Sequence, residues 1–204
     1  MSRSRWLRRP ALTVMALWLV GVVVLGLVIA HLVGGTSGAT SGAAASAADP
    51  VGRVESIPAD KRVGAAPVAG QLLGGGRYDP AAFDGHIRVV NAWGSWCTPC
   101  QKELPALRRL ALATYATPVD FLGLDEEEAS MADGQAMVRR YRLPYPSIYD
   151  EDRSIYEALA PLIASSGVPG TVVIDAQGRV AATVIGAVDE VALGAYLRQL
   201  AQSG

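Results

Sequence analysis

The sequence predicts an α/β domain, with a central mixed sheet flanked by helices, behind one N-terminal transmembrane helix. Three observations support this prediction. Strand-like and helix-like segments alternate from residue 64 onward, a Cys-x-x-Cys pair stands where the first buried strand gives way to a helix, and residues 10–48 contain no Asp, Glu, Lys or Arg. The chain has 204 residues, which is enough for one domain and its extensions.

Composition and charge argue against several classes of protein. The formal net charge of −1 gives no reason to expect a surface that binds nucleic acid or another polyanion. The chain contains only 2 Cys and 2 His, too few for a zinc framework or a small disulfide-stapled scaffold. Composition therefore gives no reason to expect a metal site or a nucleic-acid partner.

The N-terminus is predicted to form a membrane anchor at residues 11–33. Its first 20 residues contain one polar side chain, Thr13, and at about 1.5 Å per residue they span a hydrocarbon core of roughly 30 Å. Four arginines precede the segment and no charge follows before Asp49, so the positive-inside rule places residues 1–10 in the cytoplasm. A cleaved signal peptide is the alternative, because Ala45-Ser46-Ala47 fits a small-x-small cleavage pattern.

Residues 34–63 are predicted to form a flexible linker. Positions 34–48 contain only Gly, Thr, Ser and Ala, and such a stretch cannot bury enough apolar surface to offset its loss of conformational entropy. As a flexible coil, the whole segment 34–63 would span about 30 Å and would let the following domain turn near the membrane. The domain itself is predicted over residues 64–204.

Strand and helix patterns alternate through the predicted domain. An apolar run predicts a buried strand at 87–92, and leucines at helical spacing predict a helix at 98–115. The later segments are a strand at 119–124, a solvated acidic loop at 125–128, a helix at 130–142, a proline-rich loop within 141–149 that leads into a strand, strands at 171–175 and 179–185, and a helix at 189–202. This order predicts parallel strands joined by crossover helices, with an antiparallel hairpin at the edge of the sheet.

The motif Trp96-Cys97-Thr98-Pro99-Cys100 carries the predicted chemistry. It follows a strand and opens a helix, where free backbone N–H groups stabilise a thiolate. Cys100 lies one helical turn later, so Cys97 can attack a substrate disulfide and Cys100 can resolve the mixed disulfide. The other interpretations are weaker. Half a zinc site lacks two ligands, a staple across two residues removes almost no chain entropy, and inert thiols do not suit an oxidising compartment.

The run 90–105, VNAWGSWCTPCQKELP, resembles the TlpA/ResA/CcmG (DsbE) group of thioredoxin-like proteins. These are membrane-tethered thiol–disulfide oxidoreductases that act outside the cytoplasm. The resemblance extends over residues 64–202 and includes 167–175, GVPGTVVID, which is similar to the cis-proline loop of the family. It implies a thioredoxin-like fold and a single-pass protein of the cell membrane, with its domain on the outer side.

The resemblance also implies roles for individual residues. Cys97 would be the nucleophile and Cys100 the resolving thiol. The Val168–Pro169 peptide bond would be cis, and its loop would face the motif and pair with an extended substrate. The residues expected to contact substrate are Trp96, Thr98, Pro99 and Val168.

Glu103 is the predicted proton carrier. It lies three residues after Cys100 on the same face of the helix, and the Cys100 thiol must lose its proton to resolve the mixed disulfide. Ordinary thioredoxins carry a buried Asp at the position of Asn91, and because Asn cannot titrate, another acid is needed. A solvated charge on the helix surface is the alternative interpretation of Glu103.

The implied activity is reduction of protein disulfides without a cofactor. The substrate would be the oxidised Cys-x-x-Cys-His haem-binding motif of apocytochrome c, and a membrane thiol carrier of the DsbD/CcdA type would supply the electrons. Gly170 stands where proteins of the CcmG kind often carry Glu, which leaves the choice of partner open. The rival functions are an oxidase that introduces disulfides into exported proteins, a thiol peroxidase, and a redox-sensing binding module.

Overall fold

The computed structural model describes residues 51–163 and 167–203. The predicted cytoplasmic segment 1–10, the predicted anchor 11–33 and the first part of the predicted linker lie outside these residues. Within the described ranges, no helix is long and apolar enough to cross a bilayer. The structure therefore bears on the domain that follows the predicted anchor.

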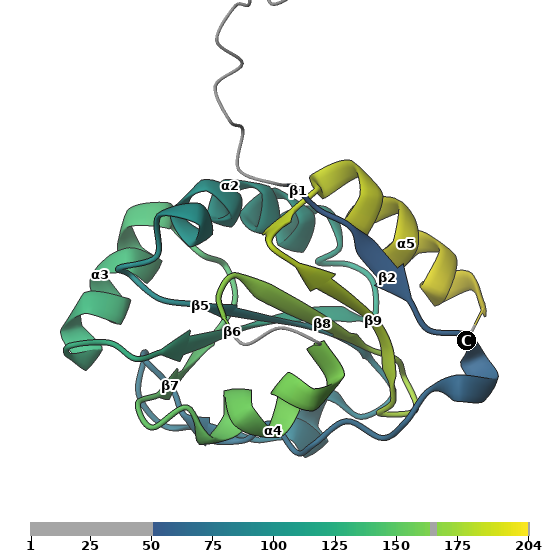
Figure 1. The fold of residues 1–204 in the computed structure, drawn as a ribbon, viewed down its shortest axis with the longest axis horizontal. Helices are drawn as coiled ribbons and strands as arrows, with labels where there is room; N and C mark the ends of the chain where they lie inside the picture. The colour runs from purple at the N-terminus through teal and green to yellow at the C-terminus, as the bar shows by residue number, and fades with distance from the viewer. Residues whose placement is uncertain (1–50, 164–166, 204) are drawn as a thin grey trace, which may run out of the picture. The chain divides into compact units, whose positions relative to one another are not determined.

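A six-stranded mixed sheet forms the centre of this domain, in the order β2-β9-β8-β5-β6-β7 (Figure 1). Its strands are β2 Val54–Ser56, β5 Ile87–Trp93, β6 Val119–Glu126, β7 Ser147–Asp150, β8 Gly170–Ile174 and β9 Val180–Ile185. The strands β5, β6 and β7 run parallel, whereas β8 and β9 form an antiparallel hairpin. The predicted parallel strands and hairpin are confirmed, but β2 rather than the hairpin forms that edge of the sheet.

Helices cover both faces of the sheet (Figure 1). They are α2 Thr98–Ala113, α3 Met131–Tyr141 and α5 Glu190–Ser203 on one face and α4 Ser154–Ile163 on the other. Successive residues of β5 serve different faces, since Val89 packs in one apolar core with Leu104 of α2 and Val90 packs in the other with Leu159 of α4. A strand covered on both faces is mostly apolar, which is why the sequence of β5, polar only at Arg88 and Asn91, does not alternate.

Several short elements complete the domain. The strands are β1 Val51–Gly52, which pairs with β10 Ala187–Val188, and β3 Gly70–Gln71, which pairs with β4 Arg77–Tyr78. The 3-10 helices are η1 Ala59–Lys61 and η2 Pro80–Phe83. The parallel pairing of β1 with β10 matters for the site, because the backbone N–H of Val188 in β10 donates a hydrogen bond to the Glu103 carboxylate.

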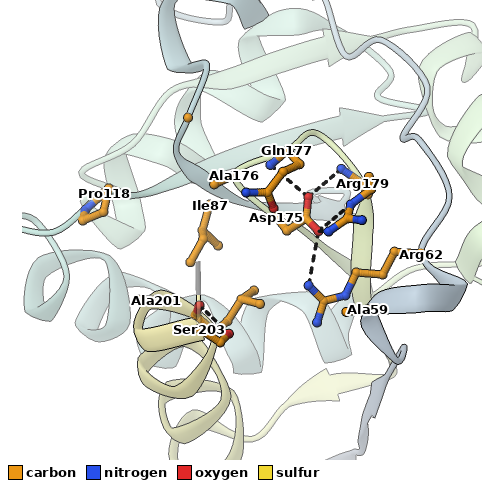
Figure 2. A pocket seen from close by; sticks show the side chains of 12 residues that line it. Ala59, Arg62, Ile87, Pro118, Asp175, Ala176, Gln177, Arg179, Ala201 and Ser203 are labelled. Atoms are coloured by element: carbon orange, nitrogen blue, oxygen red, sulfur yellow. Dashed lines mark hydrogen bonds and ion pairs between the residues drawn. The ribbon is translucent and has the colours of Figure 1, made fainter.

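Residues 51–63 are folded, so the predicted linker is wrong over this part and the domain begins before residue 64. The Arg62 guanidinium lies 3.2 Å from the carboxylate of Asp175, which also accepts hydrogen bonds from the Arg179 side chain (Figure 2). Val54 and Ile57 pack against the two apolar cores. The low-complexity composition that disfavours folding is confined to positions 34–48, and residues 51–63 carry apolar and charged side chains that the domain uses.

Helix α4 was not predicted from the sequence. The carboxylate of Asp150, at the end of β7, accepts hydrogen bonds from the backbone N–H groups of Ile155 and Tyr156, at 3.2 and 2.9 Å. These contacts satisfy N–H groups of the first turn that have no partner within the helix. The residue that caps the helix belongs to the preceding strand. Pro161 inside the helix also weakens the helical signal in the sequence of α4.

Candidate active site

The Cys-x-x-Cys motif stands where β5 ends and α2 begins. Cys97 is the N-cap residue of α2, and its Sγ accepts a hydrogen bond from the backbone N–H of Cys100 at 3.2 Å. The two sulfurs form a disulfide, with Cα atoms 5.3 Å apart. Cys97 is 4% exposed and Cys100 is completely buried, so Cys97 carries the sulfur that a substrate can reach. The helix N-terminus therefore presents its positive end to the outer sulfur.

Glu103 is buried one turn beyond Cys100 and is not a solvated charge on the helix surface. One carboxylate oxygen accepts a hydrogen bond from Asn91 Nδ2 at 2.7 Å, and the other accepts one from the backbone N–H of Val188 at 2.8 Å. Burial raises the pKa of Glu103 to about 7, although both hydrogen bonds oppose the shift. A carboxyl group with this pKa can take up or release a proton near neutral pH.

The Val168–Pro169 peptide bond is cis, in agreement with the prediction. The register of β8 pairs Gly170 with Ala92 of β5, so the loop before β8 lies at the same end of the sheet as the motif. The carbonyl oxygen of Pro169 accepts a hydrogen bond from the backbone N–H of Gly186 at 3.1 Å. The half-buried Val168 packs against both apolar cores.

The other predicted substrate-contact residues surround Cys97. The side chain of Trp96 is 53% exposed, and its indole N–H donates a hydrogen bond to the carbonyl oxygen of Glu126 at 3.3 Å. Its ring lies against Gly94, where a Cβ atom would come within 2.6 Å of the indole nitrogen. Thr98 is exposed and Pro99 is half-buried. Their contact with substrate stays a prediction.

The acidic run 125–128 is not the solvated loop that the sequence predicted. Asp125 and Glu126 are the last residues of β6 and are completely buried or nearly so, and Glu128 is 9% exposed. Burial raises the pKa of Asp125 to about 9 and that of Glu126 to about 8. Strand β6 includes Asp125 and Glu126 because both residues pair with β7. This pairing cannot be recognised from a run of acidic residues in the sequence.

Glu128 joins this acidic segment to the loop that precedes Cys97. One carboxylate oxygen accepts a hydrogen bond from Ser95 Oγ at 2.7 Å, and the other accepts one from the backbone N–H of Ser95. The Ser95 carbonyl oxygen in turn accepts a hydrogen bond from Gln101 Nε2 at 2.7 Å. Sequence reasoning missed Ser95 and Glu128, because only the parallel pairing of β5 with β6 brings these chain segments together.

The site thus combines a dithiol pair, a buried acid with a raised pKa, and a cis-proline loop. Within residues 51–163 and 167–203, no cluster of three or more His, Cys, Asp or Glu side chains could hold a metal ion. The dithiol and the acid together can support thiol–disulfide exchange.

The sequence of the chain is similar to a known protein family and to individual known proteins. The sequence profile of the AhpC/TSA family matches residues 65–183. The thiol-disulfide oxidoreductase ResA of Bacillus thuringiensis is 31% identical over 114 residues, which are 54% of this chain and 61% of that protein. The thiol:disulfide interchange protein DsbE of Allochromatium vinosum is 30% identical over 112 residues, 52% of this chain and 54% of that protein. The chain therefore spans less than two thirds of either relative.

Solved structures give a wider match. A secreted thiol-disulfide isomerase from Corynebacterium glutamicum superimposes with a TM-score of 0.67 at 25% identity, covering 73% of this chain and 92% of that chain. The likeness confirms the predicted thioredoxin-like fold.

Proposed function

The chain belongs to the AhpC/TSA family, and on this premise we propose that it is an extracytoplasmic thiol–disulfide oxidoreductase that reduces disulfides in protein substrates. One observation carries the proposal. The Cys97–Cys100 disulfide stands at the N-terminus of α2, with the buried acid Glu103 one turn behind it. The names of the similar proteins ResA and DsbE support the same activity.

The proposed reaction begins from the reduced dithiol. The Cys97 thiolate attacks one sulfur of the substrate disulfide, which forms a mixed disulfide and releases the other substrate sulfur as a thiolate that takes up a proton. The Cys100 thiol then gives its proton to the Glu103 carboxylate and attacks the Cys97 sulfur. This step restores the Cys97–Cys100 disulfide and releases the second substrate sulfur as a thiolate, which takes up the proton held by Glu103 or one from solvent. Two electrons and two protons pass to the substrate.

The reducing direction is favoured by the charges around the dithiol. A couple is strongly oxidising when its reduced form is stabilised, chiefly through its thiolate. The helix N-terminus stabilises the Cys97 thiolate, but Glu103, buried one turn behind Cys100, adds negative charge near the dithiol once it ionises above about pH 7, and this charge opposes the thiolate. An ionised Glu103 therefore favours the disulfide and a low reduction potential.

The substrate and the location follow from the family resemblance. We propose oxidised apocytochrome c as the substrate, a membrane thiol carrier of the DsbD/CcdA type as the electron donor, and the predicted segment 11–33 as a single-pass anchor. The exposed ring of Trp96 and the loop of Val168 and Pro169 would receive the substrate chain beside Cys97.

The reduction potential of the Cys97–Cys100 couple tests this proposal. The protein is equilibrated against thiol buffers of known ratio, and the oxidised fraction is measured. We expect a value near the roughly −270 mV of thioredoxin, at which the dithiol donates electrons. A value near the roughly −120 mV of a strong oxidant would contradict the reducing function and favour disulfide insertion.

Glu103→Gln is expected to slow resolution of the mixed disulfide by about 10²-fold above neutral pH. In the native protein the rate should rise as pH increases through about 7, because Glu103 then loses its proton and can accept that of Cys100. The amide cannot titrate, so the variant should lack this step. Stopped-flow measurement of substrate release across pH 5 to 9 checks both expectations.

Unfolding experiments provide the control for this variant. The folded protein keeps the Glu103 proton up to about pH 7, whereas the unfolded chain releases it near 4.5. Stability therefore falls as pH rises through this window, and Glu103→Gln should remove that fall while retaining the fold. A variant that resolves the mixed disulfide at the native rate, with the same dependence on pH, would exclude Glu103 as the proton carrier.

A further inference from the structure

A buried pair of acids lies behind the active-site loop, and the reaction proposed above assigns it no step. Asp125 is completely buried at the end of β6, and Glu128 is 9% exposed. Neither carboxyl oxygen of Asp125 has a hydrogen-bond donor among the residues that the structure describes. A buried carboxylate without a donor is strongly unfavourable, so Asp125 holds its proton at neutral pH.

Asp125 is electrostatically coupled to Glu128. Burial is the main reason that the pKa of Asp125 is raised to about 9, and the neighbouring Glu128 raises it further. A neutral Asp125 avoids repulsion with the Glu128 carboxylate, whereas an ionised Asp125 would repel it.

Glu128 connects the buried acids to the loop that precedes Cys97. Both of its carboxylate oxygens accept hydrogen bonds from Ser95, one from the backbone N–H and one from Oγ. The next residue, Trp96, donates its indole N–H to the carbonyl oxygen of Glu126. Residues 94–96 are thus fixed to the end of β6 immediately before the chain enters α2.

We infer that Glu128 is a positioning residue for the redox reaction: it holds Ser95, and through Ser95 the Cys97 sulfur, in the geometry for attack. This inference deepens the proposed function and rests on exchange by Cys97. Gly134 of α3 makes room for Asp125, since a Cβ atom there would clash with Asp125 Oδ2.

Other titratable groups face the pair from each neighbouring element. They are Glu126 in β6, Asp133 in α3 and Tyr149 in β7, and Glu151 in the following turn acts on Tyr149. The nearby cation Arg153 is engaged with Glu126 and Glu127. Glu126 also titrates in the alkaline range, with a pKa of about 8, so a pH profile must be compared with a variant that alters Asp125 alone.

The first arm of the test measures exchange between the reduced full-length protein and oxidised glutathione at pH 7. Glu128→Gln and Ser95→Ala should each lower the rate about tenfold, because a displaced nucleophile loses its alignment. Glu127→Gln is the matched control: it removes the same charge from the adjacent, 47% exposed side chain and should leave the rate within about twofold. If Glu128→Gln does not fold, Ser95→Ala provides the test, because it leaves Asp125 and Glu128 unchanged.

The second arm uses Asp125→Asn, whose amide stays neutral at every pH, whereas an ionised Asp125 would repel the Glu128 carboxylate. This variant should match the native protein at pH 7, whereas above about pH 9 the native protein should become about tenfold slower than the variant. Equal rates for Glu128→Gln and Glu127→Gln, or an alkaline loss in Asp125→Asn like that of the native protein, would overturn the inference. Exchange with glutathione can be followed in both directions. A high reduction potential would therefore refute the proposed reducing direction and would leave the test of Glu128 valid.

Discussion

Cys97→Ser is expected to abolish thiol–disulfide exchange, with a loss on the order of 10⁶-fold, the scale seen when an enzyme loses its covalent nucleophile. Cys97 caps α2 and is the more exposed of the two sulfurs, whereas Cys100 is completely buried. A hydroxyl at position 97 cannot form the mixed disulfide, and the buried Cys100 thiol cannot replace it. Reduction of a protein disulfide by the pre-reduced variant is the measurement.

Cys100→Ser is the matched control, because it removes the other sulfur by the same substitution. Cys97 should still attack, but nothing resolves the adduct, so the variant should accumulate as a covalent complex with its substrate. Mass spectrometry of the trapped species under non-reducing conditions would identify both the attacking residue and the substrate. A complex formed by Cys97→Ser and not by Cys100→Ser would reverse the assigned roles.

The central elements were predictable because their signals are local. The apolar run of β5 and the spaced leucines of α2 are each dictated by the face that the element buries. Helix α4 was missed because its cap, Asp150, comes from the preceding strand. The short strand β2 was missed because it is stabilised by its pairing with β9, more than 100 residues away along the chain.

The features of the site likewise divide into those that local sequence spacing predicts and those that depend on tertiary packing. Cys97 and Cys100 are three positions apart on one helix, so their partnership could be inferred from spacing. The contacts of Glu103 with Asn91 and Val188 depend on tertiary packing, as does the burial of Asp125 in an acidic run. Charged residues in sequence indicate solvent exposure, and only the structure shows that these acids lie beneath the helices.

Shortening the chain to residues 64–204 is expected to destabilise the domain by at least about 3 kcal/mol relative to residues 47–204. The shorter chain lacks the edge strand β2, the apolar contacts of Val54 and Ile57, and the Arg62 partner of Asp175. Asp175 is 2% exposed and would keep only part of its hydrogen bonding. Thermal unfolding of the two chains should differ by roughly 10 °C.

The same truncation should also change the active site, because β1 pairs with β10 and the backbone N–H of Val188 in β10 holds the Glu103 carboxylate. Loss of that hydrogen bond would raise the pKa of Glu103 further and move the neutral step in the rate of resolution to higher pH. Arg62→Met in the longer chain separates the two effects, since it removes the ion pair and leaves β1 in place. A truncated chain with the stability and the pH profile of the longer one would show that residues 51–63 contribute nothing to the domain, against the pairing of β1 and β2 described above.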